Sequence, residues 1–219
     1  MDINEYQNSY LYMFKEFMFY RDSLERLIKR HIKELDKFKN KNRIPFDSYW
    51  SLSTQYSFHF MKMNNIIADN AKESISYQKL ISKNYLKEFS IILEPKSDEM
   101  NNFINKYNKA RNWSSHFPIS SLRAHQNSIN IISEKDELLV NTPSHVSYDH
   151  FKDLLISNQR DLKNIDLIKE VISKDAQTIL GKKIKIKRTS NMIDEPGALK
   201  RSYDSYRYSH DRDKRNPKK

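Results

Sequence analysis

Apolar side chains recur every three or four positions along most of the first 120 residues, a period typical of amphipathic helices. Over residues 4–39 they form one broad stripe, which consists of Tyr6, Tyr10, Met13, Phe17, Leu24, Leu27, Ile28 and Leu35. Aromatic side chains at this spacing are more typical of a core or a dimer interface than of a surface that stacks on bases. We therefore expect a long first helix over residues 4–39, followed by a turn at residues 43–47 around Pro45.

The same period predicts three further helices, over residues 48–73, 76–93 and 98–117. Residues 95–98 interrupt the pattern, and Ser97 or Asp98 is a suitable N-cap for the helix that follows. Pro118 disfavours helical geometry at the residue before it, so this helix should end near Phe117. The connections are short, as an antiparallel four-helix bundle requires.

The pattern is less regular in the second half of the chain. We expect a short helix at residues 121–127 and two short strands, at residues 129–133 and 138–141, which could pair with residues 183–188. A charged turn at residues 134–137 joins the two strands. Ser147 or Asp149 then begins one or two helices that run to Leu180, before Gly181.

These elements define a mainly α fold class with three parts. Residues 1–130 are expected to form the antiparallel helical bundle, and residues 131–188 a small C-terminal region of helix and short strands. Residues 189–219 form a basic tail. A chain of 219 residues can bury a sizeable core, and its two glycines and six prolines interrupt helices at few places.

Composition removes several classes of protein. The chain has no cysteine, which excludes disulfides and thiolate metal sites. It has no run of 18 or more apolar residues, and residues 1–5 are polar and acidic. We therefore expect no membrane-spanning segment and no secretory signal, no membrane partner, and a cytoplasmic location.

The net charge of +11 is concentrated at the C-terminus. Residues 1–180 hold 26 Lys and Arg against 23 Asp and Glu, whereas residues 181–219 hold 13 against 5. Tyr203, Tyr206 and Tyr208 are interleaved with these basic residues. Basic and aromatic side chains together suit phosphate neutralisation and stacking on unpaired bases, and a solvated terminus explains the same composition equally well.

The residues with the most specific chemistry are Arg111, Asn112 and His116, with Ser115 between them. On a helix Asn112 and His116 share one face, opposite the apolar stripe, and Arg111 lies at the border between the two faces. At the end of a helix the dipole favours the imidazolium by about 0.3–1 kcal/mol, which keeps a histidine able to donate and accept a proton. A second Arg-x4-His match, at residues 26–31, falls in the middle of a basic helix and is interpreted as accidental.

An Arg-Asn-x3-His pattern at the end of a helix, within a small all-helical domain, resembles the signature of the HEPN superfamily. The resemblance covers about residues 1–130, and its motif is confined to residues 111–116. Members of that superfamily are compact helical domains, commonly dimeric, and many are metal-independent endoribonucleases of toxin–antitoxin, abortive-infection and CRISPR-associated systems. Toxins that a nucleotidyltransferase silences carry a tyrosine two residues after the histidine, and here that position is Pro118.

The resemblance implies a homodimeric ribonuclease of toxin or phage-defence type, with an antitoxin or defence-complex partner and no metal or other cofactor. In catalytic members the Arg and His of two protomers meet in one composite site. Carried to this chain, His116 acts as general base or general acid, Arg111 holds the scissile phosphate, and Asn112 orients His116 or the phosphate. RNA cleavage would leave a 2′,3′-cyclic phosphate and a 5′-hydroxyl, and DNA would survive because it lacks the 2′-hydroxyl.

Further contacts to RNA are expected at residues near the motif and at the start of the basic segment. They are Ser115, His125, Lys182, Lys183, Lys185, Lys187 and Arg188. The alternative function is a non-catalytic helical module that binds nucleic acid or a protein through its basic tail. A third is a structural adaptor in which the motif only stabilises a dimer.

Two other groups of histidines are weaker candidates. His145, Asp149 and His150 have no second cluster to complete a metal site, and polar residues at a helix start explain them better. His59 lies among Phe58, Phe60 and Met61, which indicates a histidine at the edge of the core. No metal ligand is assigned.

Overall fold

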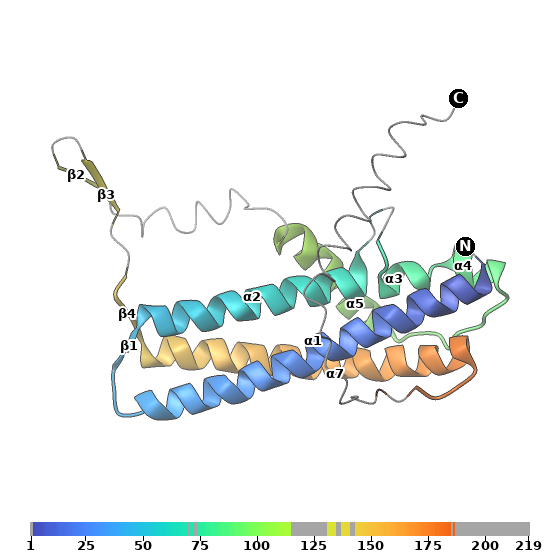
Figure 1. The fold of residues 1–219 in the computed structure, drawn as a ribbon, viewed down its shortest axis with the longest axis horizontal. Helices are drawn as coiled ribbons and strands as arrows, with labels where there is room; N and C mark the ends of the chain where they lie inside the picture. The colour runs from blue at the N-terminus through green and yellow to red at the C-terminus, as the bar shows by residue number, and fades with distance from the viewer. Residues whose placement is uncertain are drawn as a thin grey trace, which may run out of the picture. The chain divides into compact units, whose positions relative to one another are not determined.

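The computed structural model describes residues 2–69, 71, 74–114, 131–134, 137–140, 143–184 and 186, and only the backbone of residues 110–114 and of the two strands within 131–140. The described residues up to Ile184 belong to one compact unit, which is mainly helical. Figure 1 shows three long helices side by side: α1 (Ile3–Phe38), α2 (Phe46–Ala68) and α7 (Tyr148–Leu180). Among the described helices, none combines the length and apolarity needed to cross a bilayer.

Helix α1 confirms the apolar stripe that the sequence predicts. All eight residues of the stripe are buried, and the side chain of Asp2 caps the helix by accepting a hydrogen bond from the Glu5 amide at 2.8 Å. Tyr6 and Tyr10 are fully enclosed, and their hydroxyls donate to the backbone carbonyls of Leu80 and Ile172. The aromatic residues of this stripe are therefore core residues whose polar ends are satisfied.

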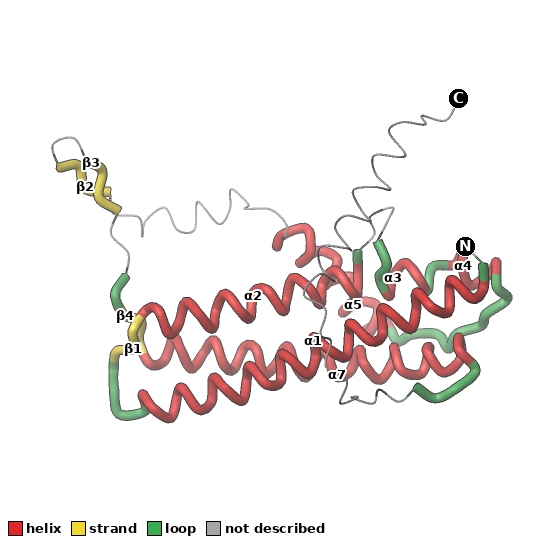
Figure 2. The backbone as a smooth tube through the Cα atoms, viewed as in Figure 1, coloured by secondary structure: helices red, strands yellow, loops and turns green. Residues whose placement is uncertain are grey.

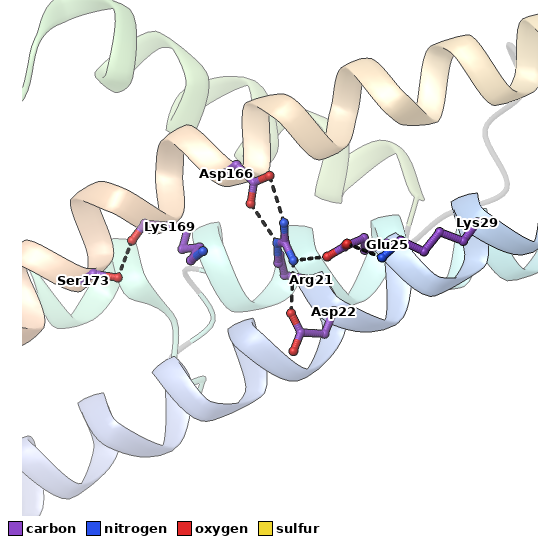
Figure 3. A network of polar contacts seen from close by, with 7 residues as sticks. All are labelled: Arg21, Asp22, Glu25, Lys29, Asp166, Lys169 and Ser173. Carbon is purple, nitrogen blue, oxygen red and sulfur yellow. Dashed lines mark hydrogen bonds and ion pairs between the residues drawn. The ribbon is translucent and has the colours of Figure 1, made fainter. Parts of the chain in front are cut away.

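Helices α1 and α7 run antiparallel and are joined by polar contacts along their length. The Gln7 amide donates to the Ile179 carbonyl at 2.9 Å near one end, and His31 packs against Phe151 near the other. Between them, Arg21 donates from Nε and Nη2 to both carboxylate oxygens of Asp166, at 2.8 and 3.1 Å, and also contacts Asp22 and Glu25 (Figure 3). A bidentate guanidinium–carboxylate pair fixes the register of the two helices as well as their distance.

Helix α7 has the ends that the sequence predicts. The Ser147 hydroxyl accepts from the His150 amide at 3.1 Å, and Gly181 ends the helix in the left-handed region at φ +65°. Its apolar face, including Ile165, Ile168 and Ile172, belongs to the same core as α1. The expected division at residue 130 therefore does not separate two cores, because α7 supplies the long partner that covers α1.

Residues 76–93 do not form the single helix that the sequence predicts. They form α3 (Tyr77–Leu80) and α4 (Lys83–Glu88), followed by an extended segment (Figure 2). Helix α2 also ends five residues earlier than predicted, because the carbonyl of Asp69 accepts from the hydroxyls of Ser74 and Ser76. Hydroxyls that bind nearby backbone groups compete with a continuous helix.

Helix α5 (Asp98–Ser114) carries the first residues of the motif. The sequence allows Ser97 or Asp98 as its N-cap. The cap is Ser97, whose hydroxyl accepts from the Met100 amide at 3.2 Å. Met100, Ile104 and Tyr107 form its buried side, and α5 packs chiefly against α2. Its predicted end at Phe117 and the predicted helix at residues 121–127 lie outside the described residues.

Two small antiparallel strand pairs complete the described structure. Strands β2 (Ile131–Glu134) and β3 (Glu137–Val140) pair with each other, close to the predicted positions. The sequence also allows pairing of these strands with residues 183–188. The structure describes residues 183, 184 and 186 of that segment, and none of the three is in a strand. The predicted turn at residues 43–47 instead contains β1 (Arg43–Pro45), which pairs with β4 (His145–Ser147) and buries Ile44.

The buried carboxylate of Asp175 joins three segments of the core. Lys96 Nζ lies 3.1 Å from Asp175 Oδ2, and the Tyr77 hydroxyl donates to the same oxygen at 2.5 Å. Lys96 also lies over the Tyr77 ring, 5.6 Å from its centroid. Asp175 is only 4% exposed, so its charge depends on these two partners. Because Lys96 is two residues before α5, this ion pair also fixes where α5 begins.

We expect Lys96→Met to lower the free energy of unfolding by roughly 3 kcal/mol, because it leaves a buried carboxylate without its cation. Urea denaturation monitored by circular dichroism would measure the change. Lys29→Met is the matched control, since Lys29 forms an exposed pair with Glu25, and it should cost less than about 1 kcal/mol. Equal losses in the two variants would contradict the dependence of Asp175 on Lys96.

Candidate functional site

The motif lies at the end of the described part of α5. The backbone is helical through Arg111 and Asn112 to Ser114, and the side chains of these residues are outside the described structure. Ser115, His116 and His125 also lie outside the described residues. Whether Arg111 and His116 share a site therefore stays a prediction.

The basic segment begins immediately after α7. Lys182 and Lys183 are exposed and follow the turn at Gly181. Lys185, Lys187 and Arg188 lie outside the described residues, as do the tyrosines and basic residues of the tail. The two described lysines are thus accessible, and their contact with RNA stays a prediction.

One pocket with a chemically mixed lining lies between α2, α5 and α7. Its volume is about 390 Å³. It is lined by Phe60, Phe103, Lys106, Tyr107, Arg160, Asp161 and Asn164. Helix α5 thus carries both this pocket and, one turn after Tyr107, the first two residues of the motif. We name it the α5 pocket.

The aromatic residues of the α5 pocket are partly packed together. The Phe60 and Tyr107 rings have their centroids 6.3 Å apart and are tilted by 40°. Tyr107 is buried, whereas Phe60 is 37% exposed and Phe103 is half-buried. Lys106 Nζ lies 5.5 Å from the centroid of the Phe103 ring, a cation–π distance. This wall is therefore apolar, with a cation at its edge.

The ionisable groups of the α5 pocket are affected by burial. Burial raises the pKa of the Asp161 carboxyl, and the nearby Arg160 guanidinium opposes that shift. Burial also raises the pKa of the Tyr107 hydroxyl, and the charge of Asp161 adds to the effect. Asp161 is therefore held in a less polar setting than a surface carboxylate, close to one cation.

Apart from the Lys106–Phe103 ring contact and the neighbouring charges of Arg160 and Asp161, the polar side chains of the α5 pocket have no hydrogen bond or ion pair to a described residue. Neither Lys106 nor Arg160 forms an ion pair with a described residue, and Asp161 and Asn164 form no hydrogen bond to one. Half-buried polar groups normally satisfy their hydrogen-bonding capacity, so these groups are available to water or to a ligand.

Sequence reasoning did not identify the α5 pocket. Arg160, Asp161 and Asn164 fall within a helix where charged and amide residues indicate a solvated face. Phe60 and Tyr107 fall on apolar stripes, which indicate core. These residues form a recognisable pocket only when three helices that are distant in sequence come together.

His31, the histidine of the second Arg-x4-His match, has a structural position. It is fully buried, its Nδ1 lies 3.2 Å from the Tyr56 hydroxyl, and its ring centroid lies 4.3 Å from that of Phe151. Burial lowers the pKa of His31 to about 4, and the backbone of Phe151 opposes the shift. His31 is therefore neutral near pH 7 and belongs to the core, as expected for an accidental match.

The other histidines with described side chains bind neighbouring groups. His59 is half-buried between the Gln55 carbonyl at 2.7 Å and the Ser23 hydroxyl at 2.9 Å, which agrees with a position at the core edge. His150 Nε2 lies 3.1 Å from the Tyr49 hydroxyl, and His145 Nδ1 lies 2.9 Å from the Ser144 hydroxyl. Within the part of the chain that the structure describes, three or more His, Asp or Glu side chains nowhere gather in a metal-binding group.

Comparison of the chain with family models, with curated proteins and with solved structures gives no match in any of the three. The functional argument therefore depends on the residues of this chain alone.

His31 should make folding stability depend on pH. Its pKa is about 4 in the folded chain and about 6.5 when unfolded, so between these values the unfolded state binds more protons. Stability should fall as the pH drops from about 6.5 to 4, by on the order of 2 kcal/mol from this residue. Urea denaturation at pH 7 and pH 4.5 should show a smaller loss for His31→Phe than for the wild type.

His145→Gln is the matched control for this measurement, because it removes a histidine at an exposed position outside the core. The same loss between pH 7 and pH 4.5 in wild type and His31→Phe would show that His31 is not the group that titrates.

Proposed function

We propose that this protein is a metal-independent endoribonuclease of the HEPN type, in which Arg111, Asn112 and His116 act on RNA. The observation that carries the proposal is the Arg-Asn-x3-His motif, which begins on α5, where the helical backbone continues through Arg111 and Asn112 to Ser114. Three buried residues, Met100, Ile104 and Tyr107, hold α5 against the rest of the core. The motif therefore starts from a helix with a fixed position, which a catalytic group requires.

The reaction is an attack of the ribose 2′-oxygen on the adjacent phosphorus. His116 removes the proton from the 2′-hydroxyl, the P–O5′ bond breaks, and the leaving 5′-oxygen takes a proton from the His116 of a second protomer. The products are a 2′,3′-cyclic phosphate and a 5′-hydroxyl, and the reaction needs no electron transfer and no metal. Arg111 binds the non-bridging oxygens, where negative charge develops, and Asn112 orients the imidazole or the phosphate.

The proposal includes a homodimer, because each composite site needs one histidine from each of two protomers. An isologous dimer with the α5 ends near its twofold axis would place the two motifs together. The exposed lysines after α7, Lys182 and Lys183, would add sequence-independent phosphate contacts. The place of the reaction in phage defence or in a toxin–antitoxin pair, and an antitoxin or defence-complex partner, are part of the same proposal.

Purified protein incubated with total RNA in excess EDTA should release fragments that end in 2′,3′-cyclic phosphate. His116→Ala and Arg111→Ala should each lower the rate by about 100-fold or more, because they remove a proton-transfer group and a phosphate-binding group. End-group analysis of the fragments, with DNA as a parallel substrate, measures both the chemistry and the requirement for a 2′-hydroxyl.

The matched control is His145→Ala, which removes an exposed histidine far from the motif in sequence and should cleave RNA at the wild-type rate. Cleavage that survives His116→Ala would reject the proposed mechanism. Intact RNA with every variant, including the wild type, would instead favour the binding module, which uses its basic tail and performs no reaction.

A further inference from the structure

The α5 pocket has the dimensions and the lining of a small-molecule site. Its volume of about 390 Å³ falls within the range of roughly 300–1,000 Å³ that is usual for ligand pockets. Its walls come from α2, α5 and α7, which are held together by the core, so the pocket belongs to the rigid part of the fold. Three aromatic and four polar side chains line it. The aromatic ones come from α2 and α5, and the polar ones come from α7 except Lys106, which is on α5.

The aromatic side comes from α2 and α5. Phe60 is 37% exposed and Phe103 is half-buried, so both rings offer surface to a ligand, whereas Tyr107 is buried. A planar aromatic ligand can stack on such rings, with a contribution that does not depend on its identity. This side therefore favours a flat ring over an aliphatic chain.

The polar side comes from α7. Asp161 and Asn164 are three positions apart, so they lie on one face of the helix, and neither forms a hydrogen bond to a described residue. A carboxylate accepts from an amino group, and an amide both donates and accepts. The pair thus matches the edge of a base that carries an exocyclic amino group, in the manner in which carboxylates and amides read cytosine and adenine.

Two cations from two different helices complete the lining of the pocket. Lys106 is on α5 and Arg160 is on α7, and both are exposed and form no ion pair with a described residue. Both an ammonium and a guanidinium attract an anionic group, and a guanidinium binds two phosphate oxygens at once. A phosphate attached to the stacked base satisfies both cations.

We infer that the α5 pocket binds one nucleotide, with an amino-bearing base stacked on Phe60 and Phe103 and its phosphate held by Lys106 and Arg160. Such a nucleotide can be free or can be an unpaired residue of an RNA strand, because both present the same base and phosphate. The inference goes beyond the proposed ribonuclease and does not depend on it, since the pocket residues are separate from Arg111, Asn112 and His116.

Binding is tested with the full-length His116→Ala protein, so that no cleavage of RNA can interfere. Isothermal titration calorimetry with AMP, CMP, UMP and inorganic phosphate separates the contributions of base and phosphate. We expect AMP or CMP to bind at least about tenfold more tightly than UMP, because UMP lacks the amino group. Inorganic phosphate alone should bind weakly. Titration with a short oligoadenylate shows whether an RNA strand binds more tightly than a single nucleotide.

Two variants separate the contributions of the base and of the phosphate to the binding affinity. Arg160→Gln should weaken every nucleotide by roughly 10- to 100-fold, because a charge-assisted contact is lost. Asp161→Asn should instead reduce the preference for amino-bearing bases over UMP, because the carboxylate that accepts from the amino group is lost. The matched control is Arg26→Gln, which removes an exposed arginine of α1 that does not line the pocket and should bind like the parent protein.

Comparable affinities for AMP and oligoadenylate would support the inference with a free nucleotide as ligand. A much tighter oligoadenylate complex that Arg160→Gln still weakens would support it with RNA as ligand. Absence of binding by both, or equal losses in Arg160→Gln and Arg26→Gln, would overturn it. These outcomes do not depend on cleavage, so a failed ribonuclease proposal and a failed pocket inference remain distinguishable.

Discussion

The carboxylate of Asp175 is the constraint on which the arrangement of this fold depends. A charge buried in a core must have its partners in place, and here they come from the segment before α5 and from α3. Lys96 and Tyr77 reach it from positions 79 and 98 residues earlier in the chain. Helix α5, on which the motif begins, thus starts beside an ion pair whose carboxylate comes from α7. The position of α5 therefore depends on α7 being folded. The Arg21–Asp166 pair (Figure 3) sets the register of α7 against α1 in the same way.

Local signals predicted the long helices well. The stripe from Tyr6 to Leu35 is buried throughout, and Ser147 and Gly181 mark the two ends of α7 because caps are short-range effects. The predicted third helix of the bundle, over residues 76–93, is wrong. The helix is interrupted at Ser82, and α7 is the long helix that packs against α1 in its place. Strand β1 was missed because its partner lies 100 residues away, and three residues show no alternation that a sequence pattern can reveal.

The candidate sites differ in what a sequence can indicate. The motif at residues 111–116 is contiguous, so it can be recognised along the chain even though its geometry cannot. The α5 pocket is the reverse case. Phe60, Tyr107 and Asp161 are separated by about fifty residues each, and each has an ordinary explanation as core or surface in its own helix. Only packing shows that a carboxylate, an amide and two cations line one pocket with three aromatic rings. Helix α5 belongs to both sites, which links the recognition of a nucleotide to the place where the motif begins.

The pairing of α1 with α7 has a consequence for synthesis of the protein. Gln7, Tyr10 and Arg21 of α1 make contacts with α7 that span 145 to 172 residues of sequence. Helix α2 and the segment of α3 and α4 also pack against α1, but the side of α1 that faces α7 stays uncovered in a nascent chain until α7 has left the ribosome. Contacts of such separation slow folding, and an uncovered apolar helix invites association with other chains. The half-made protein is therefore a natural client of chaperones that hold amphipathic helices, and ribosomes stalled before α7 should release the most aggregation-prone fragments.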